Sequence, residues 1–319
     1  GDGIGRLDDM AVFVPYTVDG DVVRVETTEV RKRYARGVLK EILMPSPYRE
    51  RPCCADYTFC GGCRYQHITY EHQLVLKEKQ VMDTFQRIGK FSDPPLLPVL
   101  ASPHCCHYRI KADFHVSFRR GRRPVMGFMS GASNRVVEIK RCEIVDERIN
   151  RLYGELRGAL KSGKCPCTGD RITLWAIGGH EKDLDPAAAP FISRMVKDKL
   201  MTVPHDGFFQ ANQYLIEEMV DRVVAAAGLA GGEIVIDGFC GSGLFSLFLA
   251  PLAGTLHGIE GNGRAIRAAG ENLERHGCRN VSLFQGDVGE VLEKIFSGIP
   301  NTVDVLVIDP PRTGCGEKL

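Results

Sequence analysis

The sequence predicts an α/β protein: a doubly wound, Rossmann-like domain preceded by a small OB-like β-barrel and a cysteine-rich α+β central domain. Three observations predict it. Short strands and tight turns fill the first 44 residues, a cysteine-rich loop follows, and helices alternate with apolar strands after residue 200. We expect the barrel at 1–46, the central domain at 47–200 and the α/β domain at 201–319.

The composition is that of a globular protein. The chain has 319 residues, of which 44% are hydrophobic and 25% charged, and this excludes disordered and fibrous classes. The longest mostly apolar stretch, residues 244–256, contains Pro251 and Gly254 and is shorter than the ~18 residues that a membrane span needs. We therefore expect that the protein does not associate with membranes. We also expect a monomer.

The near-neutral net charge of +1 conceals an asymmetry. Residues 1–150 carry 24 basic and 19 acidic side chains, a net charge of +5, whereas residues 151–319 carry 17 and 21, a net charge of −4. A basic front suits a module that binds a polyanion, joined to an enzymatic one. Uneven scatter of solvated charge explains the same numbers equally well.

The N-terminal elements are short strands. Residues 11–14 and 22–25 are strand-like and lie on either side of the turn-forming residues 19–21, and residues 30–36 form a cationic strand that contains Tyr34. An OB-type barrel would bind single-stranded nucleic acid with such a strand, through its charges and its aromatic side chain. A solvated edge strand whose charges prevent aggregation is the alternative.

The central region is predicted to mix helix and strand. Residues 70–88 read as a helix because Leu74, Val81, Phe85 and Ile88 recur on one face. Strands at 107–118 and 124–129 flank residues 119–123, a hairpin tip with four arginines. This tip is either a phosphate clamp or a solvated loop.

The C-terminal region has the βαβ pattern of a parallel sheet. Its first strand, residues 233–237, is continuously apolar up to Asp237, as in strands buried on both faces. The remaining predicted elements are helices at 213–227, 244–250, 264–276 and 290–296, and strands at 256–260, 281–285 and 303–309.

A glycine-rich loop follows the first of these strands. It reads D-G-F-C-G-S-G, with Gly241 and Gly243, and Ser246 stands where a dinucleotide fingerprint has its third glycine. This difference favours S-adenosylmethionine, which has no phosphate to bind. Glu260, at the end of the next strand, can accept both ribose hydroxyl protons, and Asp287 can read the adenine amino group. Strand-terminal acids are also common helix caps.

The twelve cysteines indicate a reducing, cytoplasmic compartment and metal or structural thiols. Cys54, Cys60 and Cys63 lie in one loop, and Cys142 is the best fourth ligand for a tetrahedral thiolate site. Zinc and a [4Fe-4S] cluster both use four thiolates, and buried free thiols are a third possibility. We interpret the other cysteine-containing sites as bystanders or structural: Cys53, the run His104–His107, and the pair Cys165 and Cys167.

Four motifs in order resemble the RNA uracil-5-methyltransferase family, and most closely its iron-sulfur branch with a TRAM domain, typified by ribosomal RNA enzymes. They are residues 54–67, 208–213, 239–243 and 309–314. The resemblance implies that Cys54, Cys60, Cys63 and Cys142 hold a [4Fe-4S] cluster. It also implies that Gln210, Phe239, Glu260, Asp287 and Asp309 line the S-adenosylmethionine site. Leu244 replaces an asparagine of the family's glycine loop.

The resemblance implies methylation of carbon 5 of a uridine, most simply in 23S ribosomal RNA. In the family a cysteine thiolate adds to carbon 6, and a glutamate later removes the proton from carbon 5. Both lie beyond the Asp-Pro-Pro-Arg motif, so we expect them downstream of Leu319 and assign no catalytic residue here. Neither Cys315 nor Cys240 matches the position of the family's thiol. We therefore expect that the chain does not methylate alone.

Two alternatives remain. A tRNA uridine-54 C5 methyltransferase would use the same motifs, and a non-catalytic RNA-binding protein could keep the cofactor fold and cluster as a scaffold. An exocyclic amine methyltransferase would prefer Asn-Pro-Pro-Tyr where this chain has residues 309–312, Asp-Pro-Pro-Arg.

Overall fold

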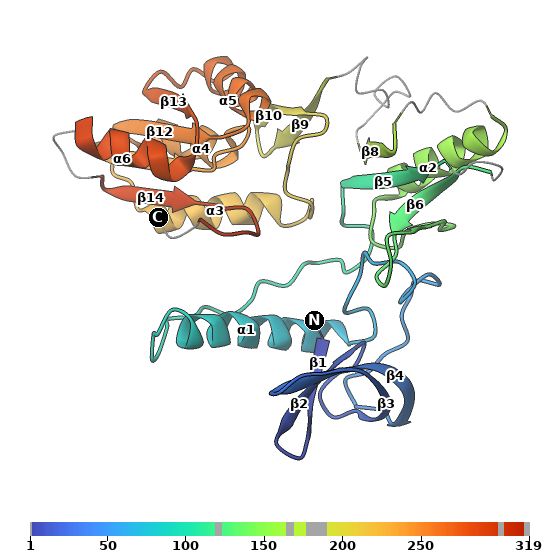
Figure 1. Cartoon of the computed structure of the whole chain (residues 1–319). Helices are drawn as coiled ribbons and strands as arrows, with labels where there is room; N and C mark the ends of the chain where they lie inside the picture. The colour runs from blue at the N-terminus through green and yellow to red at the C-terminus, as the bar shows by residue number, and fades with distance from the viewer. Residues whose placement is uncertain (1, 119–122, 164–168, 177–189, 299–302, 316–319) are drawn as a thin grey trace. The chain divides into compact units, whose positions relative to one another are not determined.

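The computed structural model describes residues 2–118, 123–163, 169–176, 190–298 and 303–315 (Figure 1). The chain divides into two compact units. The first comprises Gly1–His107, Asp113–Ile144 and Asn150–Ile172, and the second comprises Tyr108–Ala112, Val145–Ile149 and Thr173–Leu319. The predicted domain boundaries at residues 46 and 200 stay a prediction.

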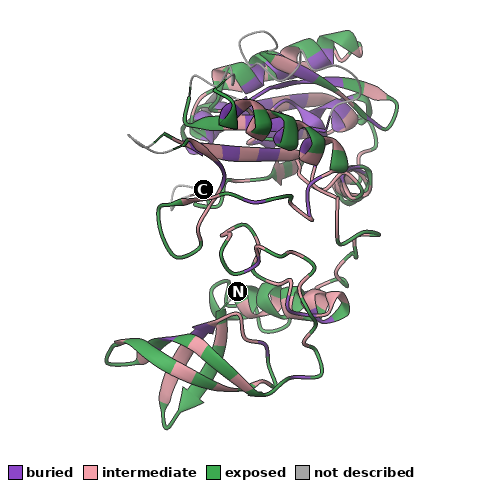
Figure 2. Ribbon diagram, turned by 90° about the vertical axis from the view of Figure 1, so that its right-hand side faces the viewer, coloured by how far each residue is buried: buried purple, intermediate pink, exposed green. Residues whose placement is uncertain are grey.

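The first unit begins with a four-stranded sheet in the order β1-β2-β4-β3. Its strands are β1 (Asp2–Leu7), β2 (Met10–Pro15), β3 (Val22–Val30) and β4 (Tyr34–Met44). Pairing is antiparallel except between β2 and β4, which run parallel. Figure 2 shows few buried positions on these strands. Among the described residues 2–44, the buried hydrophobic side chains are Val14, Val18 and Ala35. The strands predicted at 11–14 and 22–25 are confirmed.

The prediction of a single cationic strand over residues 30–36 is wrong for residues 31–33. β3 ends at Val30 and β4 begins at Tyr34, so residues 31–33 form the turn between them. The backbone N–H of Arg31 donates to the carbonyl oxygen of Tyr34 at 2.8 Å, and this bond closes the turn. The basic side chains therefore lie at a hairpin tip.

The predicted helix of the central region is confirmed as α1 (Tyr70–Arg87). Its N-terminal half is anchored, because the buried His72 contacts Asp19 at 2.7 Å. Its predicted apolar face is only partly covered, since Val81, Phe85 and Ile88 are exposed.

The central region contains another four-stranded sheet, in the order β7-β6-β5-β8. It consists of β5 (Lys111–Ser117), β6 (Val125–Met129), β7 (Val136–Val137) and β8 (Arg171–Trp175). The helix α2 (Glu147–Lys161), which we did not predict, packs Tyr153 on Phe114 with ring centroids 4.6 Å apart. The arginine-rich tip, apart from Arg123, and the pair Cys165 and Cys167 lie outside the described residues.

The second unit contains a hairpin of β9 (Phe191–Val196) and β10 (Lys199–Pro204), followed by the α/β domain. The sheet of that domain has the order β13-β12-β11-β14, and all its pairs are parallel. Its strands are β11 (Ile234–Gly238), β12 (Thr255–Glu260), β13 (Val281–Gln285) and β14 (Val305–Ile308). The doubly wound fold is therefore confirmed.

The helices of this domain cover a well-buried sheet (Figure 2). They are α3 (Ile216–Ala227), α4 (Leu244–Leu249) continued by the 3-10 turn η2 (Ala250–Leu252), α5 (Gly263–Arg275) and α6 (Val288–Gly298). One buried cluster joins Ile236 of β11 and Ile259 of β12 to Leu292 and Ile295 of α6. This core holds the carboxyl ends of the strands in place.

In the described part of the chain, no helix is both long and apolar enough to cross a membrane.

Candidate cofactor site

The strand order creates a topological switch point. The chain runs outward from β11 through β12 to β13, and then returns to place β14 on the other side of β11. Gly238 of β11 pairs with Ile308 of β14, and the N–H of Asp309 donates to the carbonyl oxygen of Gly238 at 3.4 Å. Open α/β sheets bind ligands outside the carboxyl ends of their strands at such a point.

The glycine loop bends sharply at this edge. Phe239, Gly241 and Gly243 all have positive φ, at 65°, 58° and 82°. At Gly243 a Cβ would also lie 3.2 Å from the Cβ of Ala269 in α5, so the loop is packed tightly against that helix. Gly241 has open space around its missing Cβ, which leaves room for a ligand to approach the backbone.

Glu260 links the glycine loop to the next strand. Its Oε2 accepts the N–H of Gly241 at 3.0 Å, and its Oε1 accepts the N–H of Asn262 at 2.7 Å. A carboxylate has about four acceptor positions, so these two bonds leave capacity for hydroxyl donors. Glu260 is thus oriented at the edge where a ribose was predicted.

Sequence reasoning missed Asn262. Its Oδ1 accepts the N–H groups of Arg264 and Ala265 at 2.9 and 3.1 Å, so it caps the N-terminus of α5. An asparagine directly before a helical pattern is a recognisable signal for this role. Through its own N–H, Asn262 also fixes the carboxylate of Glu260.

Gln210 and Asp309 lie together. The Nε2 of Gln210 donates to the Oδ2 of Asp309 at 2.9 Å, and both side chains retain exposure to solvent. The structure thus brings together two residues that the sequence associates only through the family resemblance.

Asp287 lies two residues beyond β13, which ends at Gln285, and it already has a structural role. Its Oδ1 accepts the N–H of Glu290 at 3.2 Å, in the first turn of α6. The side chain is exposed, so this bond leaves other acceptor positions of the carboxylate available.

Behind the glycine loop, Ser246 and Asp237 form a hydrogen-bonded pair that the sequence does not predict. Ser246 Oγ donates to Asp237 Oδ2 at 2.5 Å, and both residues are buried. Burial is the main cause that raises the pKa of Asp237 to about 7, and the negative charges of Asp309 and Glu260 add to it.

Two other residues of this region do not offer polar chemistry. Leu244, in place of the family's asparagine, is buried at the start of α4. Cys240 is buried, and burial followed by the charges of Asp237 and Glu260 raises the pKa of its thiol. A protonated, enclosed thiol is a poor nucleophile.

The cysteine loop of the first unit is folded by backbone contacts. Cys60 and Ser130 pair in an isolated antiparallel β-bridge. The N–H of Gly61 donates to the carbonyl oxygen of Met129 at 2.9 Å, and the N–H of Gly62 donates to Cys60 Sγ at 3.4 Å. At Gly61 a Cβ would lie 3.0 Å from the carbonyl oxygen of Met129, so glycine permits this close approach.

The three thiols of this loop lie close enough for their charges to act on one another. Burial, and with it the charges of Asp56 and Cys63, raises the pKa of both Cys54 and Cys60. A cationic metal centre would reverse this effect, so the donor chemistry fits a thiolate-ligated group. Nevertheless, no group of three or more His, Cys, Asp or Glu side chains in the described residues has the arrangement of a metal site.

Cys142 is held by α2. Its N–H donates to Asn150 Oδ1 at 2.9 Å, and Asn150 Nδ2 donates back to the carbonyl oxygen of Cys142 at 3.0 Å. This two-bond contact fixes the backbone of the fourth predicted ligand.

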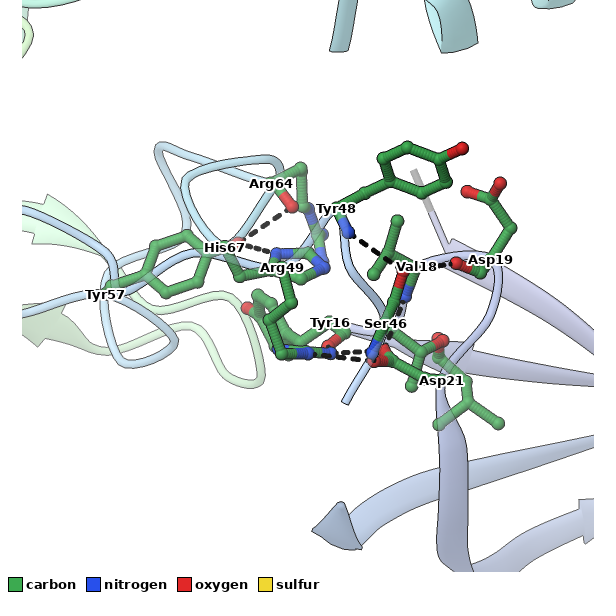
Figure 3. A network of polar contacts seen from close by, with 12 residues as sticks. Tyr16, Val18, Asp19, Asp21, Ser46, Tyr48, Arg49, Tyr57, Arg64 and His67 are labelled. Atoms are coloured by element: carbon green, nitrogen blue, oxygen red, sulfur yellow. Dashed lines mark hydrogen bonds and ion pairs between the residues drawn. The ribbon is translucent and has the colours of Figure 1, made fainter. Parts of the chain in front are cut away.

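A polar network anchors the cysteine loop to the N-terminal sheet (Figure 3). Arg49 pairs with the buried Asp21, donating from Nε to Oδ1 at 3.0 Å and from Nη2 to Oδ2 at 2.5 Å. Nearby, Tyr57 Oη donates to the carbonyl oxygen of Arg64 at 2.8 Å and contacts His67 Nδ1 at 2.7 Å. The ring of Tyr16, which directly follows β2, packs edge-on against that of Tyr57 with centroids 5.4 Å apart, and this contact joins the loop that carries the cysteines to the N-terminal sheet.

Comparisons with known proteins agree with this fold. The family model of the TRAM domain matches residues 1–40, and that of a methyltransferase domain matches residues 229–312. The solved structure of a Pyrococcus abyssi tRNA (uracil-54, C5)-methyltransferase in complex with S-adenosyl-L-homocysteine is similar in fold. Its TM-score is 0.68 at 22% identity, covering 100% of this chain and 86% of that one. Fold and site together define a TRAM-bearing methyltransferase.

Two curated relatives define the family more closely. An uncharacterized RNA methyltransferase of Nostoc sp. is 30% identical over 99% of this chain and 80% of its own length. An uncharacterized RNA methyltransferase of Synechocystis sp. is 31% identical over 100% of this chain and 80% of its own length. The chain belongs to this family of RNA methyltransferases.

Proposed function

We propose that this protein uses S-adenosylmethionine to methylate carbon 5 of a uridine in RNA, with 23S ribosomal RNA as the preferred substrate. The observation that carries the proposal is the site at the switch point, where Glu260 fixes the glycine loop and Gln210 contacts Asp309. S-adenosylmethionine supplies the methyl group when it is bound.

Each predicted residue contacts a different part of S-adenosylmethionine. Glu260 accepts the ribose hydroxyl protons, Asp287 reads the adenine amino group, and Gly241 and Gly243 let the backbone approach. Phe239 lies on the bent loop beside them, and Gln210 and Asp309 bound the side nearest β14. Binding to S-adenosylmethionine, measured by titration calorimetry, tests this assignment.

Methylation at carbon 5 needs a thiolate that adds to carbon 6 of uracil and a base that removes the proton from carbon 5. We assign neither role to a described residue. Cys240 is unsuited because it is buried and its pKa is raised.

We propose further that Cys54, Cys60, Cys63 and Cys142 bind a [4Fe-4S] cluster with a structural or RNA-positioning role. The three thiols that one loop supplies and the fixed backbone of Cys142 support it. Anaerobically purified protein should contain stoichiometric iron, and Cys142→Ser should lose it, whereas Cys278→Ser should not. Stoichiometric zinc without iron would contradict the cluster.

The RNA contact that we propose includes the hairpin tip between β3 and β4. Arg31 and Arg36 each pair with Glu29, at 2.6 and 3.8 Å, whereas Lys32 and Arg33 are exposed and form no ion pair with the described residues. Phosphate contacts by these two side chains would release counterions. The double variant Lys32→Ala/Arg33→Ala should therefore weaken RNA binding and reduce its salt dependence.

The arginine-rich segment 119–123 is proposed as a second contact, and the domain boundaries at 46 and 200 separate these functions. We also propose that the protein is a monomer and that it works in the cytoplasm. The cytoplasmic location is in keeping with the ten described cysteines, none of which is joined in a disulfide.

One experiment separates the substrates. Modified nucleosides at defined positions of 23S ribosomal RNA and of tRNA are mapped in a strain that lacks the gene. The same positions are mapped in the parent strain and in the deletion strain to which the gene has been restored. Loss of 5-methyluridine at a ribosomal site supports the proposal. Loss at tRNA position 54 alone supports the tRNA alternative, and unchanged 5-methyluridine in all RNAs would contradict both.

A further inference from the structure

A second group of thiols lies outside the proposed cluster. Cys106 Sγ is 3.9 Å from Cys53 Sγ and 4.0 Å from Cys105 Sγ. Cys53 and Cys105 are exposed and Cys106 is half-buried, so dissolved reagents can reach the group. All three residues belong to the first compact unit.

The thiol of Cys53 is oriented by a neighbouring amide. Cys53 Sγ donates to Gln66 Oε1 at 3.5 Å, and the same oxygen accepts the backbone N–H of Cys54 at 3.2 Å. Cys53 is therefore held on the segment that carries the first proposed cluster ligand.

The partner thiol lies on a segment that is tied to the last proposed ligand. The N–H of His107 donates to the carbonyl oxygen of Glu143 at 3.0 Å, and Glu143 directly follows Cys142. The contact between Cys53 and Cys106 thus spans two segments that are 53 residues apart in sequence.

We propose that Cys53 and Cys106 are a redox modification site, at which a hydroperoxide such as hydrogen peroxide forms a reversible disulfide. The Cys53 sulfur attacks one oxygen of hydrogen peroxide, the O–O bond breaks, and a sulfenic acid forms, while the displaced hydroxide takes the Cys53 proton and leaves as water. The Cys106 sulfur then attacks the Cys53 sulfur, the S–O bond breaks, and the hydroxyl leaves with the Cys106 proton as a second water. Two thiols are oxidised and one peroxide is reduced.

Cys106 has a choice of partners, and geometry favours Cys53. A disulfide usually joins Cα atoms about 4.4–6.8 Å apart, whereas consecutive Cα atoms across a trans peptide are only about 3.8 Å apart. The described residues contain no cis peptide, so a Cys105–Cys106 bridge would strain the backbone. The sulfurs of Cys53 and Cys106 are already 3.9 Å apart, and because 53 positions separate the two residues, no such backbone constraint applies to a bridge between them.

Such a bridge would hold the segments of Cys54 and Cys142 together when no metal does so. This consequence depends on the proposed cluster, but the disulfide itself does not. Peptide mapping reads the disulfide and iron analysis of the same samples reads the cluster, so failure of one is distinguishable from failure of the other.

The test uses the whole chain, purified anaerobically, treated with one equivalent of hydrogen peroxide and then alkylated. Mass spectrometry of a non-reduced digest should find the Cys53–Cys106 linked peptide as the main cross-link, and dithiothreitol should remove it. Sulfinic acid at Cys53 without a cross-link, or cross-links that favour the thiols of the cysteine loop, would overturn the proposal.

Two matched variants sharpen the result. Cys106→Ser should abolish the cross-link of Cys53, whereas Cys105→Ser should preserve it. Retention of the link at Cys53 in the first variant, or its loss in the second, would overturn the assignment. In the unaltered chain treated with peroxide, Cys53 and Cys106 should lose their reactivity towards iodoacetamide at the same rate. This measurement does not depend on how a variant folds.

Discussion

The side-chain amide of Gln210 donates to the carboxylate of Asp309 at 2.9 Å, although 99 positions separate the two residues. Gln210 lies on the loop after β10, and Asp309 directly follows β14. The bond joins two sequence motifs at one edge of the sheet and defines one side of the proposed cofactor site.

We expect Gln210→Ala to weaken S-adenosylmethionine binding about tenfold, because a hydrogen bond to a charged group contributes roughly 1.5–3 kcal/mol. Calorimetry measures the affinity, and Gln86→Ala, on α1 in the first unit, is the control. The effects of Gln210→Ala and Asp309→Asn should not add in the double variant, since they act on one contact. Full additivity would show that the two side chains act separately.

Glu260→Gln should reduce the affinity for S-adenosylmethionine at least about tenfold. The amide that replaces the carboxylate has one acceptor oxygen, so it cannot accept from both Gly241 and Asn262 and still bind ribose hydroxyls. The exposed Glu274 on α5 provides the control Glu274→Gln. Equal affinities of the two variants would remove Glu260 from the ligand site.

A pair of glycine variants separates backbone strain from ligand contact. Gly241 and Gly277 have φ of 58° and 71°, and neither has an atom within 4 Å of its missing Cβ. Alanine at either position should lower the free energy of unfolding by about 1–2 kcal/mol. Only Gly241→Ala should also weaken S-adenosylmethionine binding, because only that Cβ would occupy the proposed ligand space. Thermal unfolding and calorimetry measure the two effects.

The pKa of Asp237 predicts how stability depends on pH. Its folded-state pKa of about 7 exceeds the unfolded value near 3.8, so the folded state binds the proton more tightly between these values. The contribution of Asp237 is fully present below about pH 4 and is lost as pH rises towards 7. In the unaltered chain the midpoint temperature for unfolding of the second unit should therefore fall as the pH rises from 4.5 to 7. In Asp237→Asn this fall should be smaller. An unchanged slope would assign the decline to other groups.

Arg49→Met should lower the stability of the first unit by about 3 kcal/mol, because it leaves the carboxylate of Asp21, only 1% exposed, without its ion pair. Arg24→Met, which breaks an exposed pair with Glu41, should cost less than about 1 kcal/mol. Burial opposes ionisation of Asp21, but hydrogen bonds from Arg49, Ser46 and Val18 hold its pKa below its usual value.

This lowered pKa gives the Arg49 prediction a pH dependence. The pair stabilises the fold above the unfolded pKa of Asp21 and loses its effect as pH falls through the folded value. The difference between Arg49→Met and the unaltered chain should therefore shrink in acid. A difference that stays constant down to pH 2 would mean that Arg49 acts through packing alone.

The sequence by itself determined the α/β domain almost element by element. Continuous apolar runs such as residues 234–236 are typical of strands buried on both faces, and glycines mark the bend after β11. The helix α2 and the hairpin β9–β10 escaped prediction. The basic residues 31–33 were assigned to a strand because local pattern does not distinguish a charged strand from a charged turn.

Tertiary structure alone decided which distant side chains meet. The bond from Ser246 to Asp237, the pairing of Arg49 with Asp21 and the approach of Cys106 to Cys53 are all invisible to periodicity. Periodicity reports which face of an element is buried. Contacts between elements depend on how their cores pack and on where buried polar groups find partners, and these are properties of the whole fold.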